Sequence, residues 1–328
     1  LTAKENSRST SKAITCYMDL VITCLKKAFL STIDLVLTIA IGCLNNLVEF
    51  DENIINTDLP GFIFEVFHSK NDTLLSLGLK SVARFLDNKL MYTKGHVVYG
   101  FDAMLSALLV ATDSKNMKVL RQGFEVLRNI FEKCPPELVL ISSQDVLTKC
   151  LDVITKGLPI CDDHVILQAT SCLGVVLTKR HYCGDVPYGQ LGKLIELVVR
   201  RLGQVCHSSG HWNRVENKDL KSSTIAAVLQ VINKSLDLVI FGRSKPPSIE
   251  VLLASTNESV LQELEEFCNI LLKLCDQTCI PNVISNLRNL DDTTVPETFF
   301  KVLNKLLQTC SEGGNEMAMK FVSSCFIR

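Results

Sequence analysis

The sequence is poor in aromatic residues and has almost no net charge. Aromatic side chains make up 6% of the 328 residues, with one tryptophan, and 34 Lys and Arg residues balance 35 Asp and Glu residues to give a formal charge of −1. A domain that neutralises many phosphates usually carries a basic excess or a dense basic face. The overall charge therefore argues against a general polyanion-binding protein.

Common catalytic motifs are missing as well. The chain has no glycine-rich phosphate loop, no G-x-S-x-G elbow and no H-E-x-x-H pair. Its most apolar stretch, residues 28–48, is interrupted by Asp34, Asn45 and Asn46, whereas a spanning helix needs about 20 mostly apolar residues. These absences favour a protein that is not an enzyme and that has no cofactor, no small-molecule substrate and no membrane span.

Cysteine is abundant, with fourteen residues, but a disulfide scaffold is typical of short, loop-rich secreted chains. Several cysteines lie inside amphipathic runs, where a free thiol behaves as a small buried apolar group. Examples are Cys43, Cys150, Cys172, Cys268 and Cys310. This usage favours a reducing compartment, the nucleus or the cytosol.

What the sequence does contain is a repeated amphipathic stripe. Apolar residues recur at helical spacing, and the pattern returns after 45 and then 46 further residues. The fourth residue of every copy is small, as a helix requires where a neighbour comes close. The copies are 37–48, 75–86, 120–131 and 166–177, with Ala40, Gly78, Gly123 and Ala169 in the small position. Repeats of this length predict an all-α fold, an armadillo/HEAT-like α-solenoid.

Shorter partner helices keep the same spacing. They begin at Pro60, Val97, Gln144 and Tyr188, and Asn71 is placed to cap the helix that follows it. We therefore expect a single α-solenoid over 1–328, with regular repeats over about 12–202, irregular loops over about 203–222 and 241–257, and terminal helices over about 259–327. Because the chain begins at Leu1 and stops inside an apolar helical pattern, we expect a fragment of a longer protein.

Metal-ligand spacings are weak. Cys206, His207 and His211 could supply zinc ligands, as could His181 and Cys183, but both groups lack the paired short spacings of structural sites. Surface exposure is the simpler interpretation. Cys275 and Cys279 lie one turn apart, and we interpret them as packing around a helix end stopped by Pro281.

Two basic clusters are candidate partner-binding residues: Lys179 with Arg180, and Arg200 with Arg201. Their structural interpretation is that they complement C-terminal helix dipoles. If both helix ends lie on one rim, they form a basic patch for an acidic partner segment or a phosphate backbone. Trp212 lies in a polar loop, where it either anchors a partner or covers the ends of neighbouring helices.

Four runs resemble, in the same order, sequences of the animal meiosis inhibitor protein 1 family. They are TDLPGFIFEVF (57–67), VVYGFDAM (97–104), LCDQTCIP (274–281) and CFIR (325–328). The likeness covers about two thirds of the chain, 37–202 and 264–328, and little of 203–263. None of the runs is a catalytic motif, so the specificity comes from their order.

The resemblance implies a nuclear protein of meiotic chromosomes, built of armadillo-like repeats and needed for the DNA double-strand breaks that start homologous recombination in meiosis. It implies a non-enzymatic scaffold for the break-forming machinery, whose cutting subunit is a relative of topoisomerase VI. The expected partners are proteins of that machinery, and direct DNA contact stays open. The alternative is a nuclear transport or general adaptor protein with the same repeats.

Overall fold

The computed structural model describes residues 17–51, 53–54, 57–87, 95, 98, 100–141, 145–179, 182, 186–207, 218–244, 257–287 and 293–313. Helices account for all regular structure in these residues, as the repeat pattern predicts. The chain forms two compact units, Leu1–Val153 and Ile154–Arg328. The solenoid class is confirmed.

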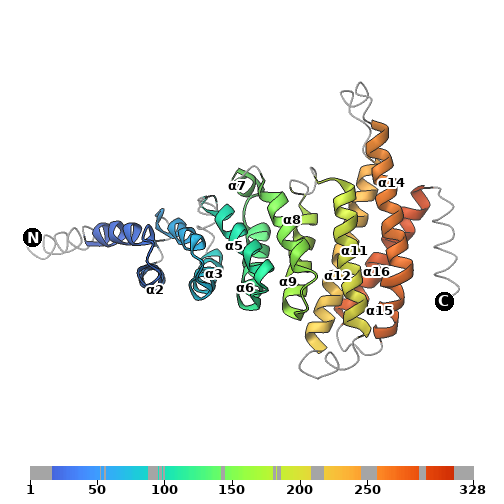
Figure 1. Ribbon diagram of the computed structural model, residues 1–328. Coiled ribbons are helices and arrows are strands. Elements are labelled where there is room, and N and C mark those ends of the chain that lie inside the picture. The colour runs from blue at the N-terminus through green and yellow to red at the C-terminus, as the bar shows by residue number, and fades with distance from the viewer. Residues whose placement is uncertain are drawn as a thin grey trace, which may run out of the picture. The chain divides into compact units, whose positions relative to one another are not determined.

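In the first unit, the helix at 17–29 is followed by α2 (Asp34–Phe50), the 3₁₀ helix η2 (Leu59–His68) and α3 (Asp72–Leu86). Next come α5 (Phe101–Ser114), α6 (Met117–Lys133), α7 (Pro136–Ile141) and α8 (Val146–Gly157), which crosses the unit boundary. Helices α2, α3 and α6 pack side by side in that order, and η2 packs on α3 and α5 (Figure 1).

The second unit consists of α9 (Asp163–Thr178), α11 (Tyr188–His207), α12 (Lys218–Ser244), α14 (Asn257–Leu274), the π-helical turn η5 (Cys275–Cys279), α15 (Ile280–Leu287) and α16 (Thr294–Gly313). Helix α12 is long and apolar enough to span a membrane, but it packs between α9 and α16 and also contacts α11 and α14. It is the central helix of this unit.

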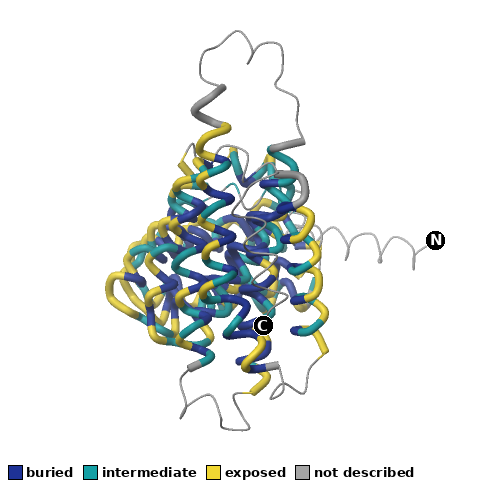
Figure 2. The backbone as a smooth tube through the Cα atoms, turned by 90° about the vertical axis from the view of Figure 1, so that its right-hand side faces the viewer, coloured by how far each residue is buried: buried dark blue, intermediate teal, exposed yellow. Residues whose placement is uncertain are grey.

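The stripes contribute to the cores of the two units, three of them in the first unit and 166–177 in the second. Buried positions lie on the inner sides of the helices and exposed positions on the outer sides (Figure 2). Leu79, Phe124 and Leu127 are each at most 1% exposed. Asn71 caps α3 as expected, because its side-chain oxygen accepts bonds from the backbone N–H groups of Thr73 and Leu74.

At Gly78 and Gly123, the small position in the stripe allows the preceding helix of the repeat to pack closely. A Cβ atom at Gly123 would lie 2.1 Å from Leu108 Cδ2 of α5, and one at Gly78 would lie 3.1 Å from Val66 Cγ1 of η2. The close neighbour is a side chain, so the physical reason is tight side-chain packing against the helix.

Several predicted boundaries are wrong. Helix α11 continues through Gly203 to His207, and α12 begins at Lys218, so both ends of the segment predicted as loop 203–222 are helical. Glycine costs a helix only about 1 kcal/mol, which the burial of Leu202 and Val205 offsets. Similarly, α12 extends to Ser244 and α14 begins at Asn257, inside the segment predicted as loop 241–257. The predicted helix at 316–327 lies outside the described residues.

Two local predictions also need correction. Residues 59–68 form a 3₁₀ helix rather than the expected α-helix. Pro281 does not end the helix. It is the second residue of α15, and α15 follows directly after the π turn Cys275–Cys279. The wider i→i+5 turn explains this arrangement, since proline lacks the N–H for an i→i+4 bond and its ring crowds the preceding carbonyl.

Candidate partner-binding surfaces

The predicted basic residues lie on α9 and α11. Lys179 follows the last residue of α9, and its ammonium lies 5.8 Å from the centre of the Tyr182 ring. Arg200 forms a 2.5 Å ion pair with Glu196, and Arg201 donates a hydrogen bond to Gln204. Arg180 and Trp212 lie outside the described residues.

The structure brings Arg200 and Arg201 together but not at a helix end. They lie about three turns into α11, with two further turns before His207. Lys179 lies just before the connection that leads to the start of α11. The helix-dipole interpretation is therefore weaker for the arginines than for Lys179, because the dipole acts over the last turn. A shared basic rim stays a prediction.

The thiols proposed as zinc ligands or helix-end packing are poorly suited to bind a metal. Burial raises the pKa of the Cys206 thiol to about 11, while the nearby Lys221 acts in the opposite direction. Burial, and secondarily Cys206, raises the pKa of Cys279 to about 12. A thiol must lose its proton to bind zinc, so these shifts disfavour binding. No group of three or more His, Cys, Asp or Glu side chains is placed to hold a metal ion within the ranges given above.

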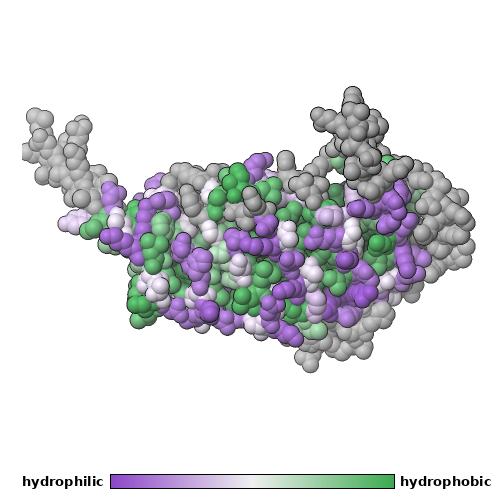
Figure 3. Space-filling view, turned by 45° about the horizontal axis from the view of Figure 1, so that its top comes forward, coloured by the Kyte–Doolittle hydropathy of each residue, from purple (hydrophilic) through white to green (hydrophobic). Residues whose placement is uncertain are grey.

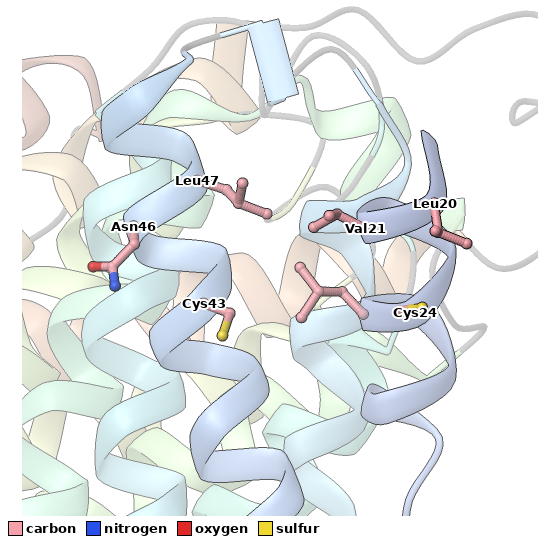
Figure 4. Close-up of a pocket in the computed structure, with 7 residues that line it drawn as sticks. Leu20, Val21, Cys24, Cys43, Asn46 and Leu47 are labelled. Carbon is pink, nitrogen blue, oxygen red and sulfur yellow. The ribbon is translucent and has the colours of Figure 1, made fainter. Parts of the chain in front are cut away.

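An apolar groove lies between the first two described helices. Leu20, Val21, Cys24 and Leu25 line one wall, and Cys43, Asn46 and Leu47 of α2 line the other, around a volume of about 640 Å³. Figure 4 shows Leu47 pointing across the groove toward Val21. None of the seven residues is charged. We call this the N-terminal groove.

A second groove of about 580 Å³ runs along α5. The turn from η2 to α3 forms one side, with His68, Ser69 and Lys70, and α5 forms the other with Ala103, Ser106, Ala107 and Val110. At its edge, Asp102 forms a 2.5 Å ion pair with Lys149. In the second half of α5, Val110 is 67% exposed and lines this groove.

The second unit contains a smaller pocket of about 230 Å³ between the start of α11 and α14. The Tyr188 and Phe267 rings, whose centres lie 5.5 Å apart, line this pocket together with Glu263 and Glu266. Glu266 accepts a 3.2 Å hydrogen bond from the side chain of Gln262 in its own helix. Elsewhere, hydrophilic and hydrophobic side chains are interspersed over the face shown in Figure 3.

Sequence reasoning missed all three surfaces. For the N-terminal groove a signal was present, because α2 is apolar on nearly every side and carries Leu35 and Ile39 opposite its buried stripe. A helix that is apolar on every side is normally buried on every side, so exposed apolar residues on it are a signal of an open surface. The other two depend on helix lengths and rotations that a linear pattern does not contain.

Comparison with known proteins gives one family. The sequence model described as "Meiosis inhibitor protein 1 N-terminal domain" matches residues 2–328. Human meiosis inhibitor protein 1 is 24% identical over 287 residues, and the mouse protein is 22% identical over 288 residues. Each alignment covers 84% of this chain and 22% of the relative, so the chain spans about a fifth of the length of these relatives.

Among solved structures, the chain is similar to a designed armadillo repeat protein in complex with the peptide (KR)4. The TM-score is 0.52 at 15% identity, and the match covers 86% of this chain and 97% of the designed protein. At that identity the likeness concerns the fold alone, which is an armadillo-type helical array.

Proposed function

The chain belongs to the meiosis inhibitor protein 1 family, and on that basis we propose that it is a non-enzymatic scaffold required for programmed DNA double-strand breaks in meiosis. The observation that carries the proposal is the family match over residues 2–328. The chain spans about a fifth of the length of these relatives. The proposed activity is therefore one in which this solenoid takes part, and the solenoid alone does not perform it.

The fold supports a scaffold in physical terms. Stacked repeats produce long surfaces that bind extended or helical segments of other proteins. The two large grooves lie on the first unit, and the N-terminal groove has no charged lining residue. Such a surface suits the apolar side of a protein segment better than a phosphate backbone, which requires basic groups. The proposed partners are thus proteins of the break-forming machinery on meiotic chromosomes in the nucleus.

A pull-down from meiotic nuclei tests this proposal. Tagged chain should recover proteins of the break-forming machinery, including the cutting subunit related to topoisomerase VI or proteins bound to it. Recovery should survive nuclease treatment, because the contacts are with protein. Recovery of nuclear import factors alone, with none of the break-forming proteins, would favour the alternative function.

That alternative, a nuclear transport or adaptor protein, draws support from the armadillo likeness and from the basic peptide bound by the designed neighbour. A transport groove would be lined by regularly repeated Asn and Trp residues. Five positions after the small residue, the four repeats carry Asn45, Ala83, Arg128 and Gly174, and the sequence has a single tryptophan. This variation favours the scaffold.

A further inference from the structure

Helix α11 packs closely on its neighbour at two levels, but the seam is open where α11 begins. It lies beside α14 and the continuation of α14 through η5 into α15 (Figure 1). A Cβ atom at Gly192 would lie 3.4 Å from Ile270 Cδ1, and one at Gly203 would lie 3.9 Å from Thr278 Cγ2. A Cβ atom at Gly189, one turn before Gly192, would meet nothing within 4 Å. The 230 Å³ pocket lies at this open level, and we call it the α11–α14 pocket.

The α11–α14 pocket lies inside the array of repeats. Each repeat of a solenoid contacts only its neighbours, so a repeat before or after the chain would stack on an outer side of the array. Both helices that flank this pocket belong to the second unit, and α12 packs against both of them. A further repeat would therefore not fill the pocket.

The lining of this pocket combines aromatic rings with carboxylates. Phe267 is 1% exposed and belongs to the core, whereas Tyr188 is half-buried. Glu263 and Glu266 are exposed and lie three positions apart, so they project from the same side of α14. Glu266 accepts a hydrogen bond from Gln262. Glu263 has neither a hydrogen bond nor an ion pair within the described parts of the chain.

Carboxylates at other seams have a basic partner from the neighbouring helix. Asp102 of α5 pairs with Lys149 of α8, and Asp237 of α12 pairs with Lys305 of α16, each at 2.5 Å. The two glutamates of the α11–α14 pocket have an aromatic and apolar surface beside them instead. Like charges three positions apart on a helix repel each other, and a cation between them removes that repulsion.

The electrostatics of the pocket favour a cation. The start of α11 carries about half a positive charge from its helix dipole, whereas the two glutamates carry two negative charges at neutral pH. The sum of about −1.5 charges attracts a positive group. A tyrosine ring adds to this attraction, because its negative face binds ammonium and guanidinium groups.

The size of the pocket indicates what kind of cation it takes. Pockets for drug-sized ligands begin at about 300 Å³. A volume of about 230 Å³ is therefore suited to a single side chain rather than to a larger ligand. Lysine and arginine combine a positive group with an apolar stem, which matches the mixed lining.

We propose that the α11–α14 pocket binds a lysine or arginine side chain of a partner protein. The positive group lies between Glu263 and Glu266, and the aliphatic stem packs on Tyr188. Ile270, which also lines the pocket and is 38% exposed, offers a further apolar contact for the stem. This inference rests on the proposed function of a scaffold and names one binding surface and the residue that it takes.

The test follows the Tyr188 ring itself. The full chain has five tyrosines, so 3-fluorotyrosine labelling gives a small set of fluorine signals, and Tyr188→Phe assigns one of them. The probes are three short peptides that differ only at two central positions, which are lysine, arginine or the neutral glutamine. The lysine and arginine peptides should shift the Tyr188 signal, less strongly as salt is added, and the glutamine peptide should bind at least about tenfold more weakly. Equal shifts by all three peptides, or none, would overturn the proposal.

Charge-removing variants locate the site. Glu263→Gln combined with Glu266→Gln should lower the affinity for the lysine peptide about tenfold or more, with no change in melting temperature, because both side chains are exposed. The matched control, Glu65→Gln combined with Glu125→Gln, removes the same charge from exposed positions of the first unit and should leave the affinity unchanged. An equal loss in both double variants would show attraction by net charge alone and contradict the proposal.

A substitution at Gly189 blocks the pocket from within. Gly189 lines it and has room for a side chain, so Gly189→Lys should supply an ammonium group that competes with the peptides. Gly189→Ser, which adds no charge, should bind them more strongly than Gly189→Lys does. Equal binding by these two variants would mean that the peptides bind elsewhere.

Other occupants give different results. If a basic group of the chain itself filled the pocket, the peptides would not shift the Tyr188 signal, and the variant lacking both Glu263 and Glu266 would melt at a lower temperature. If free polyamines were the ligand, spermidine would shift the signal as strongly as the peptides at equal concentration. Either result contradicts the proposal. All of these measurements use the purified chain, so their failure and a failed pull-down are separate outcomes.

Discussion

The hydroxyl of Ser76 in α3 donates a 2.7 Å hydrogen bond to the side-chain oxygen of Gln122 in α6. Ser76 is 2% exposed, and the two residues are 46 positions apart in the sequence. Because both groups are neutral and partly removed from water, the bond fixes one register between neighbouring repeats without the desolvation cost of a buried charge.

Replacing Gln122 by Ala should destabilise the chain by about 1–3 kcal/mol, because the buried Ser76 hydroxyl is left without its acceptor. Equilibrium urea unfolding measures the change. A serine whose hydroxyl is exposed and bonds within its own helix, Ser106, serves as the control, and Ser106→Ala should change stability by less than about 0.5 kcal/mol. Equal effects of the two substitutions would remove the register role.

Truncating the stripe should be costly. Leu79→Ala and Leu127→Ala should each destabilise by about 2–5 kcal/mol, since both side chains are fully buried and leave cavities. Leu35→Ala, at a 68% exposed position, should cost less than about 0.5 kcal/mol. Thermal and urea unfolding separate the two classes, and similar losses at buried and exposed positions would contradict the assignment of the core.

Gly123→Ala tests the small position. The added methyl would meet Leu108 at 2.1 Å, so we expect destabilisation of about 1–3 kcal/mol despite the better helix propensity of alanine. Gly189→Ala is the matched control, because nothing lies within 4 Å of its added Cβ atom. A stabilised Gly123→Ala protein would show that the two helices are not in close contact.

The half-buried Cys206 thiol should make stability decrease at high pH. The folded chain holds the pKa of Cys206 at about 11, above its ordinary value of 9.0. Above pH 9 the unfolded chain therefore loses this proton first, and the free energy of unfolding falls between pH 9 and 11. Cys206→Ala should show a shallower decline over that window than the unaltered chain. Parallel pH profiles would mean that the surroundings of Cys206 do not raise its pKa.

Much of the fold follows from local pattern. The stripe at 120–131 and the Asn71 cap are set by residues within a few positions of each other, so a linear reading finds them. The 3₁₀ helix at 59–68 was missed because its period of 3.0 differs little from 3.6 over ten residues. The π turn before Pro281 arises from how α14 joins α15, which no short motif specifies.

The candidate sites were harder to predict for a different reason. Clusters such as Arg200–Arg201 stand out in a sequence. Exposed basic residues on a helix often form ion pairs within that helix, however, as Arg200 does with Glu196. The N-terminal groove consists of ordinary core-type residues, and only the placement of the helices shows that Cys43 and Leu47 line a groove. Whether such residues lie in the core or line a groove depends on the three-dimensional arrangement of the helices.

Counting double-strand breaks in meiotic nuclei that lack this protein tests the central claim most directly. If the chain acts as a scaffold for the break-forming machinery, chromosomal breaks in early meiosis should be nearly absent, and restoring the unaltered gene should bring them back. Breaks formed in normal number without the protein would contradict the account.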